Sequence, residues 1–64
     1  MENIEKIERL LKKNTEGLTI QEISKMIGIS RNTAAVALAE LKGGEKVRIR
    51  PIGKAKLHYW GNGN

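Results

Sequence analysis

The sequence lacks the combinations of residues that carry out catalysis. The chain has a single histidine, His58, and no cysteine. The lack of cysteine excludes disulfides and thiolate metal sites. No carboxylate pair, no combination of nucleophile, base and orienting group, and no glycine-rich phosphate loop is evident along the chain. The sequence therefore predicts a protein that is not an enzyme and that uses no cofactor, metal or small-molecule ligand.

The cations are chemically more informative. The net charge is +5. Residues 45–64 contain five Lys and Arg and one Glu, whereas residues 1–44 contain seven Lys and Arg and six Glu. An asymmetry of this kind indicates a polyanionic partner that contacts mainly the C-terminal third of the chain. A solvated basic surface without a specific partner is the alternative.

The cations of the C-terminal third alternate with apolar residues. Residues 46–50 and 54–59 both have a period of two, which predicts strands, and residues 51–53, with Pro51 and Gly53, predict the turn between them. We expect a β-hairpin at 46–59. Its core face is predicted to carry Val47, Ile49, Ala55, Leu57 and Tyr59, and its solvent face Lys46, Arg48, Arg50, Lys54, Lys56 and His58.

Three predicted helices must position this hairpin. Apolar residues at helical spacing from Ile4 to Leu11 predict the first helix, at about 2–14. Thr19 and Glu22 have the spacing of a capping box, which predicts a second helix at about 20–27 that Gly28 ends. The third is expected at about 30–42, before Gly43-Gly44, and its inward residues are predicted to be Ala34, Ala37, Leu38 and Leu41.

The connection between the second and third helices is very short. Ser30 is placed to cap the third helix only two residues after Gly28. Helices joined by so short a link must cross steeply, which is the helix-turn-helix arrangement. Ile29, within the turn, is expected to point into the core.

This order of elements resembles the winged helix-turn-helix domain of bacterial and archaeal transcriptional regulators, over about residues 4–60. The most specific stretch is 18–33, with Leu38 and Leu41 following at the family's spacing, and residues 47–59 look like the wing. The resemblance implies an α+β winged helix, a three-helix bundle followed by a C-terminal hairpin. We expect the domain at 1–60 and a disordered tail at 61–64.

The resemblance also implies a double-stranded DNA-binding module, a transcriptional regulator, with helix 30–42 in the major groove. At the start of that helix, Arg31 suits guanine or a phosphate, and Asn32 suits adenine. The hydroxyl groups of Ser30 and Thr33 suit phosphate oxygens. Ser30 is also required as a helix cap whether or not DNA is bound.

Further along the same helix, the residues expected to face DNA are apolar where many relatives have polar or basic ones. They are Ala35, Val36 and Ala39. Three interpretations are open: Ala35 or Val36 touches thymine methyl groups, this face packs on a protein partner, or alanine serves helix propensity alone. We expect limited sequence specificity.

The hairpin at 46–59 is better suited to phosphates, and an arginine or lysine at its tip is able to enter a minor groove. If its four cations each neutralise one phosphate, the logarithm of the binding constant falls with the logarithm of salt concentration at a slope of roughly −3.6. Protection of an exposed edge strand against aggregation is the alternative role for these charges. The four residues, predicted to project from one face of the hairpin, are Arg48, Arg50, Lys54 and Lys56.

A single DNA-binding module buries only about 600–1,000 Å², so we expect a homodimer or attachment to something larger. A protein-interaction winged helix that uses the alanine-rich face is the alternative function, and RNA binding ranks third. Tyr59 is expected to close the core, and Trp60 to cover the first helix or a dimer interface. The apolar run 34–39 is far below the roughly 20 residues of a membrane span, and a cytoplasmic, nucleoid-associated protein is expected.

Overall fold

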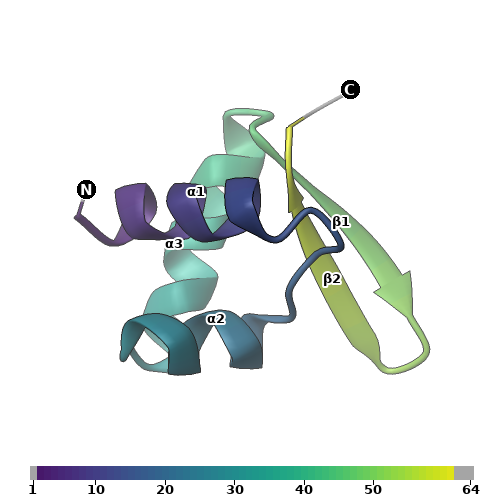
Figure 1. The fold of residues 1–64 in the computed structure, drawn as a ribbon, viewed down its shortest axis with the longest axis horizontal. Helices are drawn as coiled ribbons and strands as arrows, with labels where there is room; N and C mark the ends of the chain where they lie inside the picture. Colours follow the sequence, from purple (N-terminus) through teal and green to yellow (C-terminus); the bar gives the residue numbers. More distant parts are fainter. Residues whose placement is uncertain (1, 62–64) are drawn as a thin grey trace.

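Three helices precede an antiparallel hairpin in this computed structural model, which describes residues 2–61 (Figure 1). Helix α3 runs across both α1 and α2, and the hairpin lies beside the three helices. The predicted α+β winged-helix arrangement is confirmed. The elements are α1 (Glu2–Lys13), α2 (Ile20–Ile27), α3 (Arg31–Gly43), β1 (Val47–Ile52) and β2 (Ala55–Trp60).

The helix ends are set by the local signals that the sequence carries. At the start of α2, the N–H of Glu22 donates to Thr19 Oγ1 at 3.2 Å, and the N–H of Thr19 donates to Glu22 Oε1 at 2.9 Å. These two bonds are the predicted capping box. Gly28 ends α2 in the left-handed conformation with φ +72°, and Ser30 caps α3 by accepting from the N–H of Thr33 at 3.1 Å.

The core lies where α1, α2 and α3 meet. Ile7, Leu11 and Ile23 are completely enclosed, and the four predicted inward residues of α3 are buried. Alanine at two of those four positions allows α3 to approach its neighbours closely. Ile29, in the turn, packs partly buried against this core as predicted. Replacing a fully enclosed isoleucine or leucine by alanine costs roughly 2–5 kcal/mol in such a site.

The hairpin turns at Gly53 and Lys54, and the prediction of a turn at residues 51–53 was wrong. Ile52 pairs with Ala55, and Gly53 has φ +59° at the first turn position, as a type II′ turn requires. Pro51 therefore lies inside β1. Proline is tolerated there because β1 has a strand on only one side.

The predicted faces of β2 are also wrong. Val47 pairs with Trp60, and Ile49 pairs with His58. His58 and Trp60 therefore lie on the core face, as Val47 does. Leu57 and Tyr59 lie on the opposite face, which they share with the arginines of β1. Because the strand period is two, a pairing shift by an odd number of residues moves every side chain to the other face. Ala55, also predicted inward, is exposed.

A short extended segment connects the helices to the hairpin. The N–H of His58 donates to the carbonyl of Leu18 at 2.8 Å, and the N–H of Leu18 donates to the carbonyl of His58 at 3.1 Å. Strand β2 therefore has β1 on one side and this bridge on the other. Just before it, Gly17 has φ +93° and lies against the ring of Tyr59. Tyr59 thus packs outside the core instead of closing it.

Trp60 covers the C-terminal end of α1, one of the two positions expected for it. It packs on the core, and Lys12 Nζ lies 5.5 Å from the centre of its ring. Lys12 also pairs with Glu8 at 2.8 Å. Gly61, the first residue of the predicted tail, donates its N–H to Lys46 at 2.8 Å, whereas residues 62–64 lie outside the described part of the chain.

Within residues 2–61, no helix combines the length and the apolar character that crossing a membrane requires.

Candidate nucleic-acid interface

The first turn of α3 presents polar side chains to solvent. Arg31, Asn32 and Thr33 are all exposed, as is the capping residue Ser30. The Ser30 hydroxyl group donates to Thr33 Oγ1 at 2.9 Å while it accepts from the Thr33 N–H. Its hydrogen is therefore committed to the cap, and the hydroxyl hydrogen of Thr33 is the one that can reach an external acceptor.

Beyond its first turn, α3 exposes small and apolar side chains. Ala35, Val36 and Ala39 are exposed, and Val36 retains 62% of its accessible surface. At 100° per residue, Val36 and Ala39 lie on the side of the helix opposite the buried residues. No bulky side chain lies between Val36 or Ala39 and an approaching surface; the exposed acidic residue of this helix, Glu40, lies one turn after Val36. The helix can therefore lie close to whatever it contacts.

The hairpin cations are exposed but do not share one face, so this part of the prediction is wrong. Arg48 and Arg50 project from the outer face of β1. Lys54 lies in the turn, and Lys56, opposite Pro51, is on the face that leads toward the core. The positive charge is therefore spread over both faces of the hairpin. The reason is again the pairing of β2, which places Lys56 on the same face as His58.

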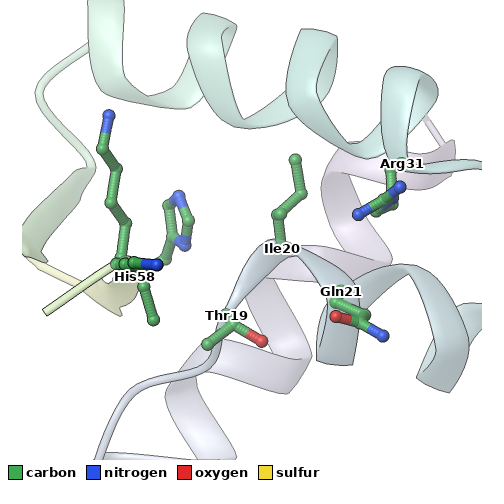
Figure 2. Close-up of a pocket in the computed structure, with 8 residues that line it drawn as sticks. Thr19, Ile20, Gln21, Arg31 and His58 are labelled. Atoms are coloured by element: carbon green, nitrogen blue, oxygen red, sulfur yellow. The ribbon is translucent and has the colours of Figure 1, made fainter. Parts of the chain in front are cut away.

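A hollow of about 380 Å³ lies between the start of α2, the start of α3 and β2 (Figure 2). In the close-up, Ile20 lies between His58 on one side and Arg31 on the other. The lining of the hollow includes three cations and no acidic residue. We call this site the hollow; its lining residues are Thr19, Ile20, Gln21, Arg31, Lys54, Ala55, Lys56 and His58.

The start of α2 adds hydrogen-bond donors to the hollow. The capping box uses the N–H groups of Thr19 and Glu22. The N–H groups of Ile20 and Gln21, at the first two helical positions, have no acceptor within the helix. Together with the helix dipole, such groups favour an anion. The capping box was the sequence signal for this feature, but the sequence alone did not connect it with Arg31 or the hairpin.

His58 was predicted to face solvent, and this is wrong, because only 6% of its surface is exposed. Its Nδ1 lies 3.0 Å from the carbonyl oxygen of Leu18, so Nδ1 carries the proton of the neutral ring. Burial lowers the pKa of His58 below its ordinary value; the bond to Leu18 opposes this shift, and the nearby charge of Lys56 adds to it. The imidazole is therefore neutral at pH 7 in the free protein.

The cations around the hollow and on the hairpin are not neutralised within the described residues. Between residues 2 and 61, the one ion pair is that of Lys12 with Glu8 on α1. Arg31, Arg48 and Arg50 thus remain available to an external anion, as do the lysines of the hairpin. Comparison of the sequence with models of known protein families and with curated proteins found no match.

Proposed function

We propose that this chain binds double-stranded DNA, with α3 in the major groove and the hairpin on the phosphate backbone. The observation that carries the proposal is the group of unpaired cations that extends from the start of α3 to the hairpin. A phosphate backbone is the polyanion that such a surface fits best, since each cation can replace a condensed counterion. The members of this group are Arg31, Arg48, Arg50, Lys54 and Lys56.

In this proposal the two ends of the surface have different tasks. Arg31 and Asn32 read base edges, and Thr33 donates its hydroxyl hydrogen to a phosphate. Ala35 and Val36 allow close approach and contact thymine methyl groups. The hairpin cations bind phosphates without reading sequence, so affinity comes mostly from the hairpin.

We further propose that the protein regulates transcription in the cytoplasm, on the nucleoid, as the resemblance to winged helix-turn-helix regulators implies. One copy of such a module buries only about 600–1,000 Å² on DNA. Useful affinity then requires two copies on paired half-sites or attachment to a larger assembly.

The salt dependence of binding to a duplex of mixed sequence tests this proposal. If the four hairpin cations each neutralise a phosphate, the logarithmic slope is roughly −3.6. Changing Arg48→Ala together with Arg50→Ala reduces the slope by about 1.8. The matched control, Lys6→Ala with Arg9→Ala, removes the same charge from exposed positions of α1 and leaves the slope almost unchanged. Absence of binding at low salt, or equal slopes for the two double variants, contradicts the proposal.

A protein-interaction module is the second candidate, because the exposed face of α3 is apolar. Val36 is the large apolar residue at its centre. Changing Val36→Glu places a bulkier, negatively charged side chain where α3 is proposed to lie close to DNA, so affinity for every duplex falls if α3 binds in the groove. If α3 instead packs on a protein, the same change leaves DNA binding unaffected. Loss or retention of DNA affinity therefore decides between the two functions.

A further inference from the structure

The DNA proposal assigns no task to the imidazole of His58, which lines the hollow. Its Nδ1 is fixed by the carbonyl of Leu18. Its Nε2 has no hydrogen-bond partner among residues 2–61. Every fully buried side-chain nitrogen or oxygen in that range has a hydrogen-bond partner. Since Nε2 has none, it is not fully buried and remains accessible to solvent. The ring lines the hollow, and Nε2 is its one nitrogen that is free to bond a ligand there.

Figure 2 shows how His58 lies relative to its neighbours. The ring and the side chain of Ile20 both point toward α3, and Arg31 lies beyond Ile20. With Nδ1 bonded on one side, the ring cannot turn without losing the bond to Leu18. Nε2 is therefore presented in a fixed direction, which is what a specific hydrogen bond to a ligand requires.

The charges around the ring decide which ligand fits. From α3 comes Arg31, and from the hairpin come Lys54 and Lys56. Strand β1 places uncharged Ile49 opposite His58, and α2 lines the hollow with uncharged side chains.

The remaining neighbours offer no acceptor to a protonated ring. The carboxylate of Glu22 is engaged by Thr19 in the capping box, and α1 places Lys12 over Trp60. No lining residue supplies a carboxylate to Nε2. An imidazolium in this position needs an anion from outside, and Ile20 and Gln21, whose N–H groups have no acceptor within the helix, line the same hollow.

We propose that the hollow holds one phosphodiester oxyanion of bound DNA, that Nε2 of His58 donates a hydrogen bond to it, and that binding therefore takes up one proton. The proton comes from solvent and binds to the Nε2 lone pair. No covalent bond is broken, and the N–H donates to a phosphate oxygen. This inference rests on the proposed DNA binding and adds to it a ligand for one site and a coupling to pH.

The coupling has a definite sign. In the free protein burial keeps the ring neutral, whereas a phosphate at Nε2 favours the charged ring and raises its pKa. Affinity for DNA therefore rises as pH falls from the pKa of the complex toward that of the free protein. One proton limits the rise to about tenfold per pH unit. Above the pKa of the complex, affinity does not depend on this group.

Two measurements test the inference. The first is the dissociation constant for a duplex of mixed sequence, between about pH 5.5 and 8 at constant ionic strength. The wild type binds more tightly as pH falls, and His58→Asn, which keeps an amide N–H for the carbonyl of Leu18, loses that dependence. All other titrating groups are common to both proteins, so the difference between the two isolates His58.

The second measurement needs no variant. The pKa of His58 is measured by NMR from its ring resonances in the free protein, with the duplex, and with inorganic phosphate against chloride at equal ionic strength. The duplex raises the pKa, and inorganic phosphate raises it by a smaller amount. This readout holds even if His58→Asn fails to fold.

The outcomes separate the inference from the function on which it rests. If the wild type binds no duplex at any pH, the proposed function fails first, and an unchanged pKa in phosphate then removes the anion site as well. If the duplex binds but the pKa of His58 stays the same, or the variant retains the pH dependence, the inference is overturned while DNA binding stands. If inorganic phosphate raises the pKa of His58 as much as the duplex does, the hollow is a site for free phosphate and the inference is overturned.

Discussion

The exposed face of α3 and the hairpin differ in almost every property that matters for binding. Helix α3 contains two cations and one acid, Arg31, Lys42 and Glu40, for a net charge of +1. The strands and turn of the hairpin contain four cations and no acid. Helix α3 is fixed by four buried side chains, whereas the hairpin packs on the core mainly through Val47 and Trp60 and pairs with Leu18 through His58. Shape and charge are thus divided between two elements.

This division has a consequence for recognition. A nearly neutral, small-residue helix fits a groove closely but supplies few groups that distinguish bases. A cationic hairpin supplies affinity but no sequence information. Variants in the two elements must therefore differ in kind: those of the hairpin change salt dependence, and those of α3 change sequence preference.

The largest expected effect comes from breaking the attachment of the hairpin at Gly17. A Cβ atom at this position meets the Tyr59 ring at 2.8 Å and the Cβ of Leu57 at 3.2 Å, and φ is +93°. Gly17→Ala therefore strains the backbone and displaces β2, and we expect the free energy of unfolding to fall by more than about 2 kcal/mol. Urea denaturation measures this loss.

Gly28→Ala is the matched control for that variant. Gly28 also has a positive φ, +72°, but a Cβ there meets nothing within 4 Å. Its cost is the conformational one alone, about 1 kcal/mol. Equal losses for the two variants contradict the view that contact with Tyr59 and Leu57 holds the hairpin in place.

The next effect concerns reading of sequence by α3. Asn32→Ala removes no charge, so its salt slope stays that of the wild type, while discrimination at one base pair weakens by about 1–3 kcal/mol. Arg48→Ala, on the hairpin, weakens binding to all duplexes alike and reduces the slope by about 0.9. Binding to a pool of duplexes at two salt concentrations measures both quantities. Equal behaviour of the two variants contradicts the division between helix and hairpin.

The helical half of the fold was predictable from sequence because its signals are local. The Thr19 and Glu22 capping box, Gly28 and Ser30 each determine a helix end through bonds that span four residues or fewer. The observed α2 has the predicted bounds, α1 ends one residue earlier than predicted, and α3 begins and ends one residue later than predicted. DNA binding and the roles of the α3 and hairpin residues stay predictions, because no bound partner tests them.

The faces of β2 were not predictable from alternation alone. Alternation in residues 54–60 does not show whether the odd-numbered or the even-numbered residues face the core. That choice depends on which residues form the turn. A turn at 51–53 would place Leu57 opposite Val47, whereas the observed turn at Gly53 and Lys54 places Trp60 there. The sequence signal for the observed turn was Gly53 at the first position of a two-residue turn. The prediction instead placed Pro51 in the turn, which shifted the pairing.

The hollow could not be predicted, because it depends on that choice. Its residues come from three parts of the chain, around Thr19, Arg31 and His58. Only the observed phase of β2 turns His58 inward and brings its ring beside Ile20. An error in one strand register therefore concealed the site as well as the face.

A smaller effect separates the two roles of Ser30 at the start of α3. Ser30→Ala removes the cap and costs about 1 kcal/mol of stability. Ser30→Asp keeps a side-chain oxygen for the N–H of Thr33, so stability is retained, but it adds a negative charge beside Arg31 and weakens DNA binding. Thermal denaturation and a binding titration on both variants measure the two roles separately. If Ser30→Asp binds DNA as the wild type does, the start of α3 does not contact DNA.

The smallest effect is the pH dependence of stability that His58 causes. Because the pKa of His58 is lower in the folded chain than its ordinary value of 6.5, the unfolded chain binds the proton more strongly. Stability is therefore complete above about pH 6.5 and falls as pH drops toward the folded pKa. Burial of the ring is the main cause, and the nearby charge of Lys56 adds to it.

Glu8 provides the internal comparison for this measurement. Its pKa is lowered by the hydrogen bond from Lys12, so the stability it contributes is lost only below its ordinary value of 4.5. Urea denaturation between about pH 5 and 8 therefore reports His58 and not Glu8. His58→Asn abolishes the change in this range. If the variant keeps it, the buried imidazole is not the group responsible. Loss of stability and gain of DNA affinity over the same pH range, both abolished in the variant, would trace both to one nitrogen atom of the hairpin.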